Sequence, residues 1–223
     1  MPLRPVTEIP TILEGFADPR AETVTVGRML LPGFSHYLRV LFPAMGADGA
    51  PLRWSALAPG SITAQTQWWD VVETGDPSDP RWAEITTPPM GTMDAATSAA
   101  LAGLLSRHTF PPGECYFLVW EGSAGLRPWV AGAASILVAP NARRMHVLAG
   151  ALDDAPESPT EDSRHCSPLW WIAADGSWCV GNDLYGRSVY VGGDLALVQA
   201  IMRSGAVESV VVDPRQTVYP EDH

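Results

Sequence analysis

Residues 169–212 read LWWIAADGSWCVGNDLYGRSVYVGGDLALVQAIMRSGAVESVVV, and this stretch decides the fold class. Two β-rich segments, Leu169–Ala174 and Ser177–Gly181, flank Asp175-Gly176, a dipeptide typical of a two-residue type I′ hairpin turn. A third β-rich segment, Arg187–Val191, follows after a short loop. The pattern predicts three consecutive strands.

The same stretch then predicts a helix and a last strand. Asp194 is a favourable N-cap residue, and Gly205 is a favourable residue just beyond a helix C-terminus. Between them, apolar residues recur at helical spacing up to Ser204, and Val207–Val212 is again β-rich. The C-terminal unit is therefore predicted to be strand-strand-strand-helix-strand.

The hairpin turn also predicts which side chains share a face of the sheet. In the predicted register Trp171 opposes Val180, so it shares a face with Trp178, while Trp170 lies on the other face with Cys179. Two adjacent tryptophans on a strand leave two alternatives. Either both faces of the sheet are covered, or one tryptophan of the pair is exposed and marks a binding surface.

The upstream sequence supplies further elements of the same kinds. The predicted strands are Glu22–Leu31, Phe34–Phe42 (a short helix is the alternative here), Cys115–Glu121, Trp129–Ala139 and Arg144–Leu152, and the predicted helix is Asp94–Arg107. Trp54–Pro80 is predicted to form ordered loops with short elements, packed by their tryptophans. The predicted fold class is α+β, a mixed and mainly antiparallel sheet with two or more helices packed on it.

The chain length fits a single domain. At 223 residues, 46% of them hydrophobic and 17% charged, the chain can cover a sizeable core without disulfides or a metal. We expect one domain over residues 1–223, with mobility in an N-terminal arm, 1–20, and in the acidic, Pro/Ser/Thr-rich loop 153–167.

Charge and composition exclude several classes of partner and chemistry. Fourteen basic residues stand against 25 acidic ones, a net charge of −11, which disfavours nucleic acid and anionic membranes. Every basic residue is an arginine, so lysine-based chemistry is excluded. The N-terminus does not resemble a signal peptide, no apolar run reaches the length of a membrane span, and the three cysteines fit reduced thiols. We expect a cytoplasmic protein.

No motif predicts catalysis or a bound metal. His165-Cys166 and Cys179 lack the paired spacing of a zinc site, and no Gly-x-Ser-x-Gly elbow is present. Gly192-Gly193 precedes a helix as phosphate-binding turns do, but the Asp194 carboxylate would occupy the free amides. We expect no cofactor and no metal, and the sequence leans against an enzyme.

Several segments together resemble a known group of sequences. The segments are Tyr37–Ala44, Arg53-Trp54, Tyr116–Gly122, Ser167–Trp171, Asp175–Val180, Asp183 and Tyr190–Gly193. In them the chain resembles an uncharacterised family of hypothetical proteins from GC-rich bacteria of the actinobacterial type. The resemblance implies one domain of shared architecture and no assigned function.

The leading hypothesis is a non-catalytic protein-binding or regulatory domain, such as a toxin-neutralising immunity protein, whose acidic and aromatic surface meets a basic partner. The candidate binding residues are Trp170, Trp171, Asp183, Tyr185 and Arg187. One alternative is a small-molecule-binding protein or an atypical hydrolase with an aromatic pocket. Another is a homodimer in which exposed tryptophans meet.

Overall fold

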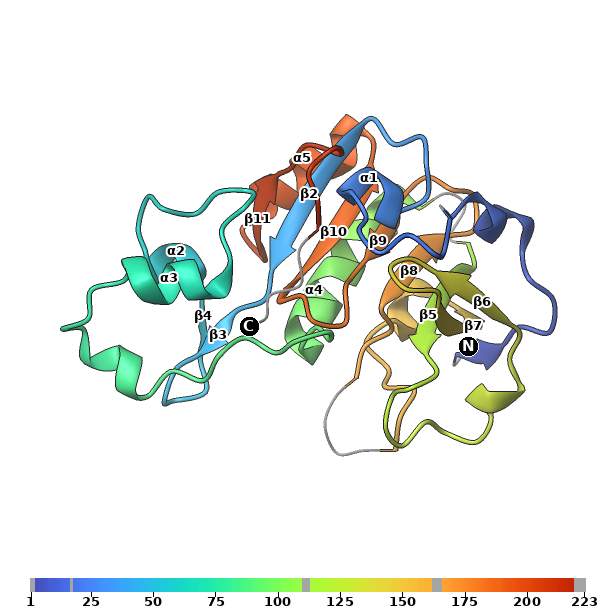
Figure 1. Cartoon of the computed structure of the whole chain (residues 1–223), viewed down its shortest axis with the longest axis horizontal. Helices are drawn as coiled ribbons and strands as arrows, with labels where there is room; N and C mark the ends of the chain where they lie inside the picture. Colours follow the sequence, from blue (N-terminus) through green and yellow to red (C-terminus); the bar gives the residue numbers. More distant parts are fainter. Residues whose placement is uncertain (1–2, 17, 110–112, 162–165, 219–223) are drawn as a thin grey trace.

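A computed structural model of the chain describes residues 3–16, 18–109, 113–161 and 166–218. Within these ranges nine strands form one sheet in the order β1-β7-β5-β8-β9-β10-β2-β11, with β6 beside β7 at the same margin as β1 (Figure 1). Its strands are β1 (Arg4–Pro5), β2 (His36–Leu41), β5 (Cys115–Trp120), β6 (Ser135–Val138), β7 (Arg143–Gly150), β8 (Trp170–Ala173), β9 (Cys179–Gly181), β10 (Ser188–Gly193) and β11 (Glu208–Val211). A separate short hairpin joins β3 (Ala44–Met45) and β4 (Pro51–Leu52). The predicted α+β fold class is confirmed.

The chain also contains short α-helices and 3-10 helices. The α-helices are α1 (Val26–Met29), α2 (Trp54–Leu57), α3 (Trp68–Thr74), α4 (Ala95–Leu105) and α5 (Leu195–Ser204), and the 3-10 helices are η1 (Thr11–Gly15), η2 (Pro80–Ala83), η3 (Ser106–His108), η4 (Val130–Gly132) and η5 (Leu152–Asp154). No helix in the described part of the chain is long and apolar enough to cross a lipid bilayer.

The two longest helices start where the sequence predicts. The Asp94 carboxylate accepts from the Thr97 N–H at 2.9 Å at the start of α4, and the Asp194 carboxylate accepts from the Leu197 N–H at 2.8 Å at the start of α5. Each bond satisfies an amide that has no partner within its helix. Gly205, with φ of 63°, ends α5 as predicted.

Both faces of the sheet are covered. On one face, side chains of α4 and α5 pack with Trp171, Trp178 and Val180. On the other face, the N-terminal segment around α1 packs with Trp170 and Ile172. The predicted register is confirmed, since Trp171 pairs with Val180 and Ile172 pairs with Cys179. Of the two alternatives for this tryptophan pair, the structure has the doubly covered sheet.

The predicted type of the β8–β9 turn is wrong. Gly176 has φ of 74°, but Asp175 has no positive φ, whereas a type I′ turn requires both. The Gly176 N–H donates to the Ala173 carbonyl at 2.9 Å, and the next ladder bond joins the Ala173 N–H to the Trp178 carbonyl at 3.2 Å. The loop is longer than two residues, yet it preserves the pairing.

The strand predicted at Glu22–Leu31 is also wrong. This segment contains α1, and only Thr25 makes an isolated bridge, to Thr217. Val26, Met29 and Leu30 lie at helical spacing and are buried against the sheet, so burial on one face overrides β propensity. The segment Trp129–Ala139 is a strand only over Ser135–Val138.

The arm and the loop expected to be mobile both contain packed elements. In the arm, β1 pairs with β7, and Leu13 is 2% exposed. In the loop 153–167, Thr160 bridges Leu126, and residues 162–165 lie outside the described ranges.

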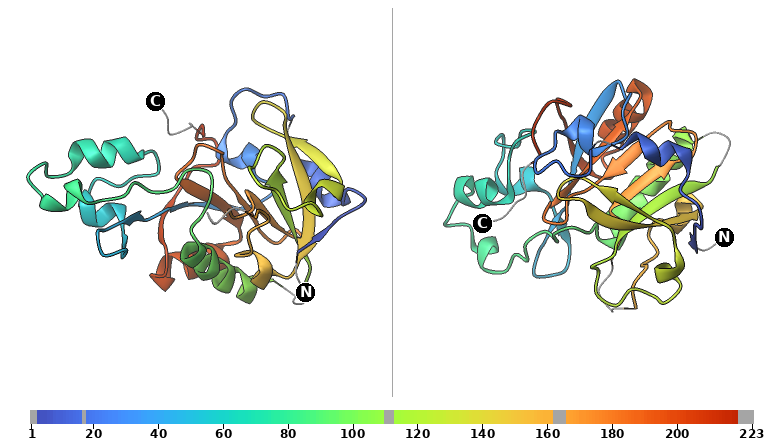
Figure 2. Two further views of the ribbon diagram at one scale, coloured as in Figure 1. Left: turned by 90° about the horizontal axis from the view of Figure 1, so that it is seen from below. Right: turned by 45° about the vertical axis from the view of Figure 1, so that its right-hand side comes forward.

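Residues 51–90 form a lobe that extends to one side of the sheet (Figure 1; Figure 2, left). The prediction for Trp54–Pro80 is confirmed, because Trp54, Trp68 and Val71 make a small core of their own around short helices. Buried Arg39 of β2 fastens this lobe to the sheet. Its guanidinium donates to the carbonyls of Ala64 and Thr66 at 3.2 and 2.6 Å.

Candidate functional site

The predicted binding pair Trp170 and Trp171 lies in the core. Both side chains are 0% exposed, on opposite faces of β8. The Trp170 indole N–H donates to the Met29 carbonyl at 3.1 Å, and the Trp171 indole N–H donates to the Pro168 carbonyl at 3.0 Å. These two residues hold the layers together and offer no surface to a partner.

The loop that carries the other predicted residues is mainly structural. Asp183 is 4% exposed and accepts from Arg143 at 2.8 Å, and Arg187 is 8% exposed and donates to the Pro88 carbonyl. Tyr185 is 48% exposed, with the Arg143 guanidinium 5.7 Å from its ring centroid. Of the five predicted residues only Tyr185 is on the surface, so the five do not form one contact site.

The second adjacent tryptophan pair behaves differently because it lies on a helix. Trp68 and Trp69 open α3, whose first turn is fixed by the Gln67 N–H donating to the Asp70 carboxylate at 2.7 Å. Neighbouring residues on a helix point about 100° apart, so a pair at its edge divides between core and solvent. Trp68 is 1% exposed and Trp69 is 47% exposed. The sequence predicts ordered loops with short elements here, which does not specify which of the two tryptophans is buried.

Trp69 borders a surface hollow of about 340 Å³ on the lobe, which we call the tryptophan groove. Its lining residues are Trp68, Trp69, Val72, Pro77, Trp82, Ile85 and Thr87. The rings of Trp68 and Trp82 lie 6.3 Å apart, and Trp68 packs edge-on against Trp54 at 5.5 Å. The groove therefore has an aromatic wall braced from behind by the core of the lobe.

The Trp68 indole N–H has no acceptor among the described residues. The other tryptophans with less than 2% exposure all donate theirs, Trp54 to the Phe42 carbonyl at 2.7 Å and Trp178 to the Thr109 hydroxyl at 2.9 Å, as do Trp170 and Trp171. A buried donor without a partner costs about 1–3 kcal/mol. Trp68, the exception, is also one of the residues that line the groove.

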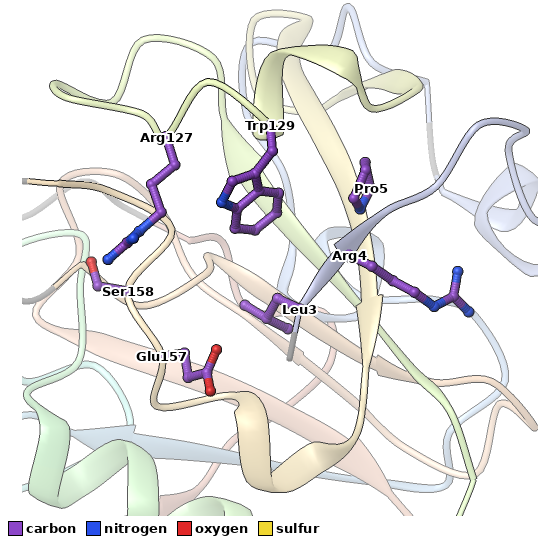
Figure 3. A pocket seen from close by; sticks show the side chains of 7 residues that line it. All are labelled: Leu3, Arg4, Pro5, Arg127, Trp129, Glu157 and Ser158. Carbon is purple, nitrogen blue, oxygen red and sulfur yellow. The ribbon is translucent and has the colours of Figure 1, made fainter. Parts of the chain in front are cut away.

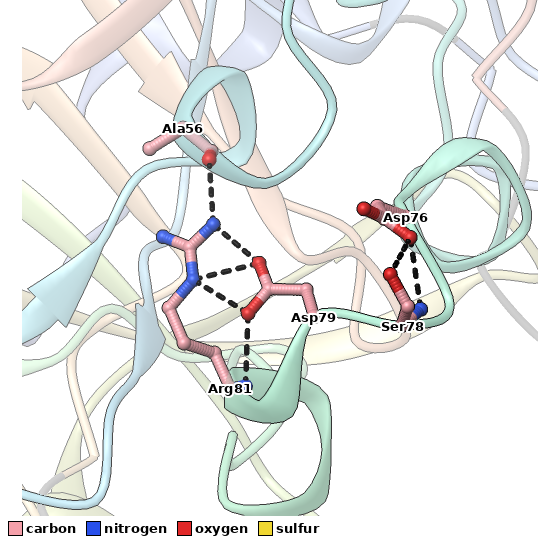
Figure 4. Close-up of polar contacts among 5 residues, drawn as sticks. All are labelled: Ala56, Asp76, Ser78, Asp79 and Arg81. Atoms are coloured by element: carbon pink, nitrogen blue, oxygen red, sulfur yellow. Dashed lines mark hydrogen bonds and ion pairs between the residues drawn. The ribbon is translucent and has the colours of Figure 1, made fainter.

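The segment that forms the groove is rich in acidic residues. Residues 67–87 contain the acidic residues Asp70, Glu73, Asp76, Asp79 and Glu84 and the single basic residue Arg81. Arg81 is held by Asp79 at 2.5 Å, and Asp76 accepts from Ser78 (Figure 4). Hydrogen bonds from Arg81 lower the pKa of Asp79, and those from Ser78 lower the pKa of Asp76. Both carboxyls are therefore charged at neutral pH.

A larger hollow of about 500 Å³ lies beside β1 (Figure 3). Arg127 and Trp129 project into it from one loop and Glu157 from another, on opposite sides of Leu3 in the view of Figure 3. Its walls mix charges of both signs, and Arg4 at its margin pairs with Glu114. Unlike the tryptophan groove, this hollow has no buried donor without a partner among its described lining residues.

Two of the three thiols are unsuited to nucleophilic chemistry. Burial raises the pKa of Cys115 and of Cys179 to about 12, so both are protonated at neutral pH. Within the described ranges no group of three or more His, Cys, Asp and Glu side chains is placed to hold a metal ion. His165, which forms an adjacent pair with Cys166 in the sequence, lies outside those ranges.

The residues that line the tryptophan groove are suited to binding a ligand. The lining of the groove consists of indole rings and aliphatic side chains, and the Thr87 hydroxyl is the one polar side chain besides the indoles among its lining residues. Comparison of the chain with family models, with curated proteins and with solved structures gives no match.

Proposed function

We propose that this protein is a non-catalytic binding domain that holds a basic segment of another protein in the tryptophan groove, as a regulator or an immunity-type protein does. The observation that carries the proposal is the half-exposed Trp69 at the rim of a hollow walled by Trp68 and Trp82. Exposed tryptophan in a preformed hollow is the residue type that most often dominates binding energy.

The chemistry around the groove favours a cationic side chain. A guanidinium or ammonium over an indole face gains about 0.5–2 kcal/mol from the ring quadrupole. Glu73 lies one helical turn after Trp69, and both are exposed on α3. An arginine or lysine in the groove would therefore meet an aromatic face and a carboxylate together, while its aliphatic stem would cover Val72.

The size of the groove limits what it can hold. At about 340 Å³ it lies near the lower end of the range for ligand pockets, which suits one or two side chains of a longer segment. The remainder of the partner would lie on the acidic surface outside, where charge chiefly affects the association rate. We expect modest affinity for short peptides.

Titration with a synthetic arginine- and proline-containing peptide, followed by calorimetry, tests the proposal. The wild-type protein should bind it and should not bind the same peptide with arginine replaced by glutamate. Trp69→Ala should weaken binding at least tenfold, a change of about 1.4 kcal/mol. Trp129→Ala is the matched control, because Trp129 is 36% exposed and lies outside the groove. Equal binding of the two peptides would contradict the proposal.

A small-molecule role is the second candidate, favoured by the hollow of Figure 3. Arg127 and Glu157 at its walls could hold the carboxylate and the ammonium group of one zwitterionic ligand, with the Trp129 ring against its apolar part. A calorimetric screen with free amino acids tests it. In that case Trp129→Ala should abolish binding, and Trp69→Ala should leave it unchanged.

A further inference from the structure

The strand β11 ends the sheet with unpaired backbone groups. The Val212 N–H donates to the Tyr37 carbonyl, and Val210 pairs with Arg39 in the same register. Bonding alternates along an antiparallel strand, so the N–H and C=O groups of Ser209 and Val211 point away from β2. Among the described residues nothing bonds to these outward groups.

This edge lacks the features that usually protect an edge strand. Glu208–Val211 contains no proline, lysine or bulge, and its one charged residue, Glu208, is held by the amides of Trp54 and Ser55 at 2.7 and 2.9 Å. The opposite margin of the sheet is formed by β1, of only two residues, and by β6. The edge at β11 is therefore open to another strand.

An apolar patch adjoins the open edge. Leu195 and Met202 of α5 are 50% and 47% exposed, and Val211 of β11 is 59% exposed. Together with Val198 and Gln199 they line one surface hollow of about 360 Å³, in which Arg203 carries the only full charge (Figure 1 shows β11 beside α5). Helix and strand thus present one continuous contact surface.

We propose that a second copy of this chain occupies this surface, forming a two-fold dimer in which β11 pairs with β11. With the axis at Val210, the outward groups of Ser209 bond those of Val211 in the second copy, in antiparallel register. The same axis sets the two α5 helices antiparallel, so Leu195 of one copy meets Met202 of the other. Both contacts follow from one symmetry operation.

Charge favours a second copy over a basic partner here. The chain carries a net charge of −11, but the patch contains no acidic side chain and contains Arg203. Asp194 lies at the opposite end of α5. Antiparallel helices place Arg203 of each copy near Asp194 of the other, whereas a basic segment would meet the Arg203 charge. This inference does not rest on the proposed function, because the tryptophan groove lies on another part of the molecule.

Sedimentation analysis of the full chain tests the dimer. The wild-type protein should sediment with twice the chain mass of 23.9 kDa. Ser209→Pro removes an outward N–H and leaves the bonds to β2, and Val211→Asp and Met202→Glu place charge in the patch. Each should raise the dimer dissociation constant at least about tenfold. Leu137→Asp is the control, since Leu137 is 43% exposed on β6 and should leave the dimer intact.

The result that would overturn the inference is a wild-type protein that sediments as a single chain at high micromolar concentration. A dimer with an unchanged dissociation constant in Ser209→Pro and Met202→Glu would overturn it equally. Circular dichroism and the melting temperature of each variant separate loss of the interface from loss of the fold. Met202→Glu serves this purpose best, because a half-exposed helix position tolerates glutamate.

Discussion

At the scale of single residues, the tryptophans divide into those that build the molecule and those that face outward. Trp54, Trp170, Trp171 and Trp178 are fully buried and each donates its indole N–H to a protein acceptor. Burial fixes the position of each ring, and the hydrogen bond of its N–H fixes its orientation. Trp69 has neither constraint, which leaves its side chain available to a partner.

This division predicts different costs of truncation. Trp170→Ala should lower the free energy of unfolding by about 3–5 kcal/mol, because it leaves a cavity and an orphaned Met29 carbonyl. This loss is what a core residue predicts, whereas the sequence placed Trp170 among the candidate binding residues. Trp69→Ala should cost less than about 1 kcal/mol. Urea denaturation measures both, and equal losses would contradict the division.

The cysteines provide a second prediction at this scale. Burial raises the pKa of Cys115 and Cys179 to about 12 from an ordinary value near 9. A thiol reagent at pH 8 should therefore modify at most one cysteine per native chain, Cys166, and all three after denaturation. Between pH 9 and 12 the unfolded thiols ionise before the folded ones, so the free energy of unfolding should fall as pH rises through this window. Modification of two thiols in the native chain would contradict the burial.

At the scale of elements, local signals in the sequence predict well where nothing competes with them. The starts of α4 and α5 follow from Asp94 and Asp194, since a cap depends on the three residues after it. The register of β8 on β9 follows from alternation of side chains, even though the turn differs in type. The predictions of a strand at Glu22–Leu31 and of a binding site at Trp170 and Trp171 were wrong, because these outcomes depend on contacts between distant segments. Whether Val26 helps cover a sheet, or Trp171 meets a helix, depends on segments far away in the chain.

The caps allow a direct prediction at this scale. Asp194→Ala should lower the free energy of unfolding by about 1 kcal/mol, because the Leu197 N–H loses its acceptor in the partly buried first turn of α5. Asp194→Asn should retain most of that stability, since its side-chain oxygen can still accept. Thermal and urea denaturation of the two variants provide the comparison. An alanine variant as stable as the wild type would show that the cap does not stabilise α5.

At the scale of the whole molecule, the two proposed contact surfaces lie in opposite electrostatic settings. The segment that forms the groove, residues 67–87, contains five acidic residues and one basic residue, and the groove is proposed to take a basic segment. The β11 edge would join two chains that each carry a net charge of −11. Attraction between opposite charges weakens with salt, whereas repulsion between like charges is relieved by it, over a screening length of about 10 Å at 0.1 M.

Salt should therefore move the two equilibria in opposite directions. Raising sodium chloride should weaken binding of the arginine peptide. It should strengthen self-association, because screening the repulsion between two chains of net charge −11 outweighs its effect on the exposed Arg203–Asp194 pairs, while the β11 hydrogen bonds and apolar contacts persist. Calorimetry follows the first and sedimentation follows the second, on the same preparation. Trp69→Ala should change only the peptide response and Met202→Glu only the dimer response. A dimer that dissociates as salt increases would mean that ion pairs hold it, and the apolar patch at Leu195, Met202 and Val211 would then not be its basis.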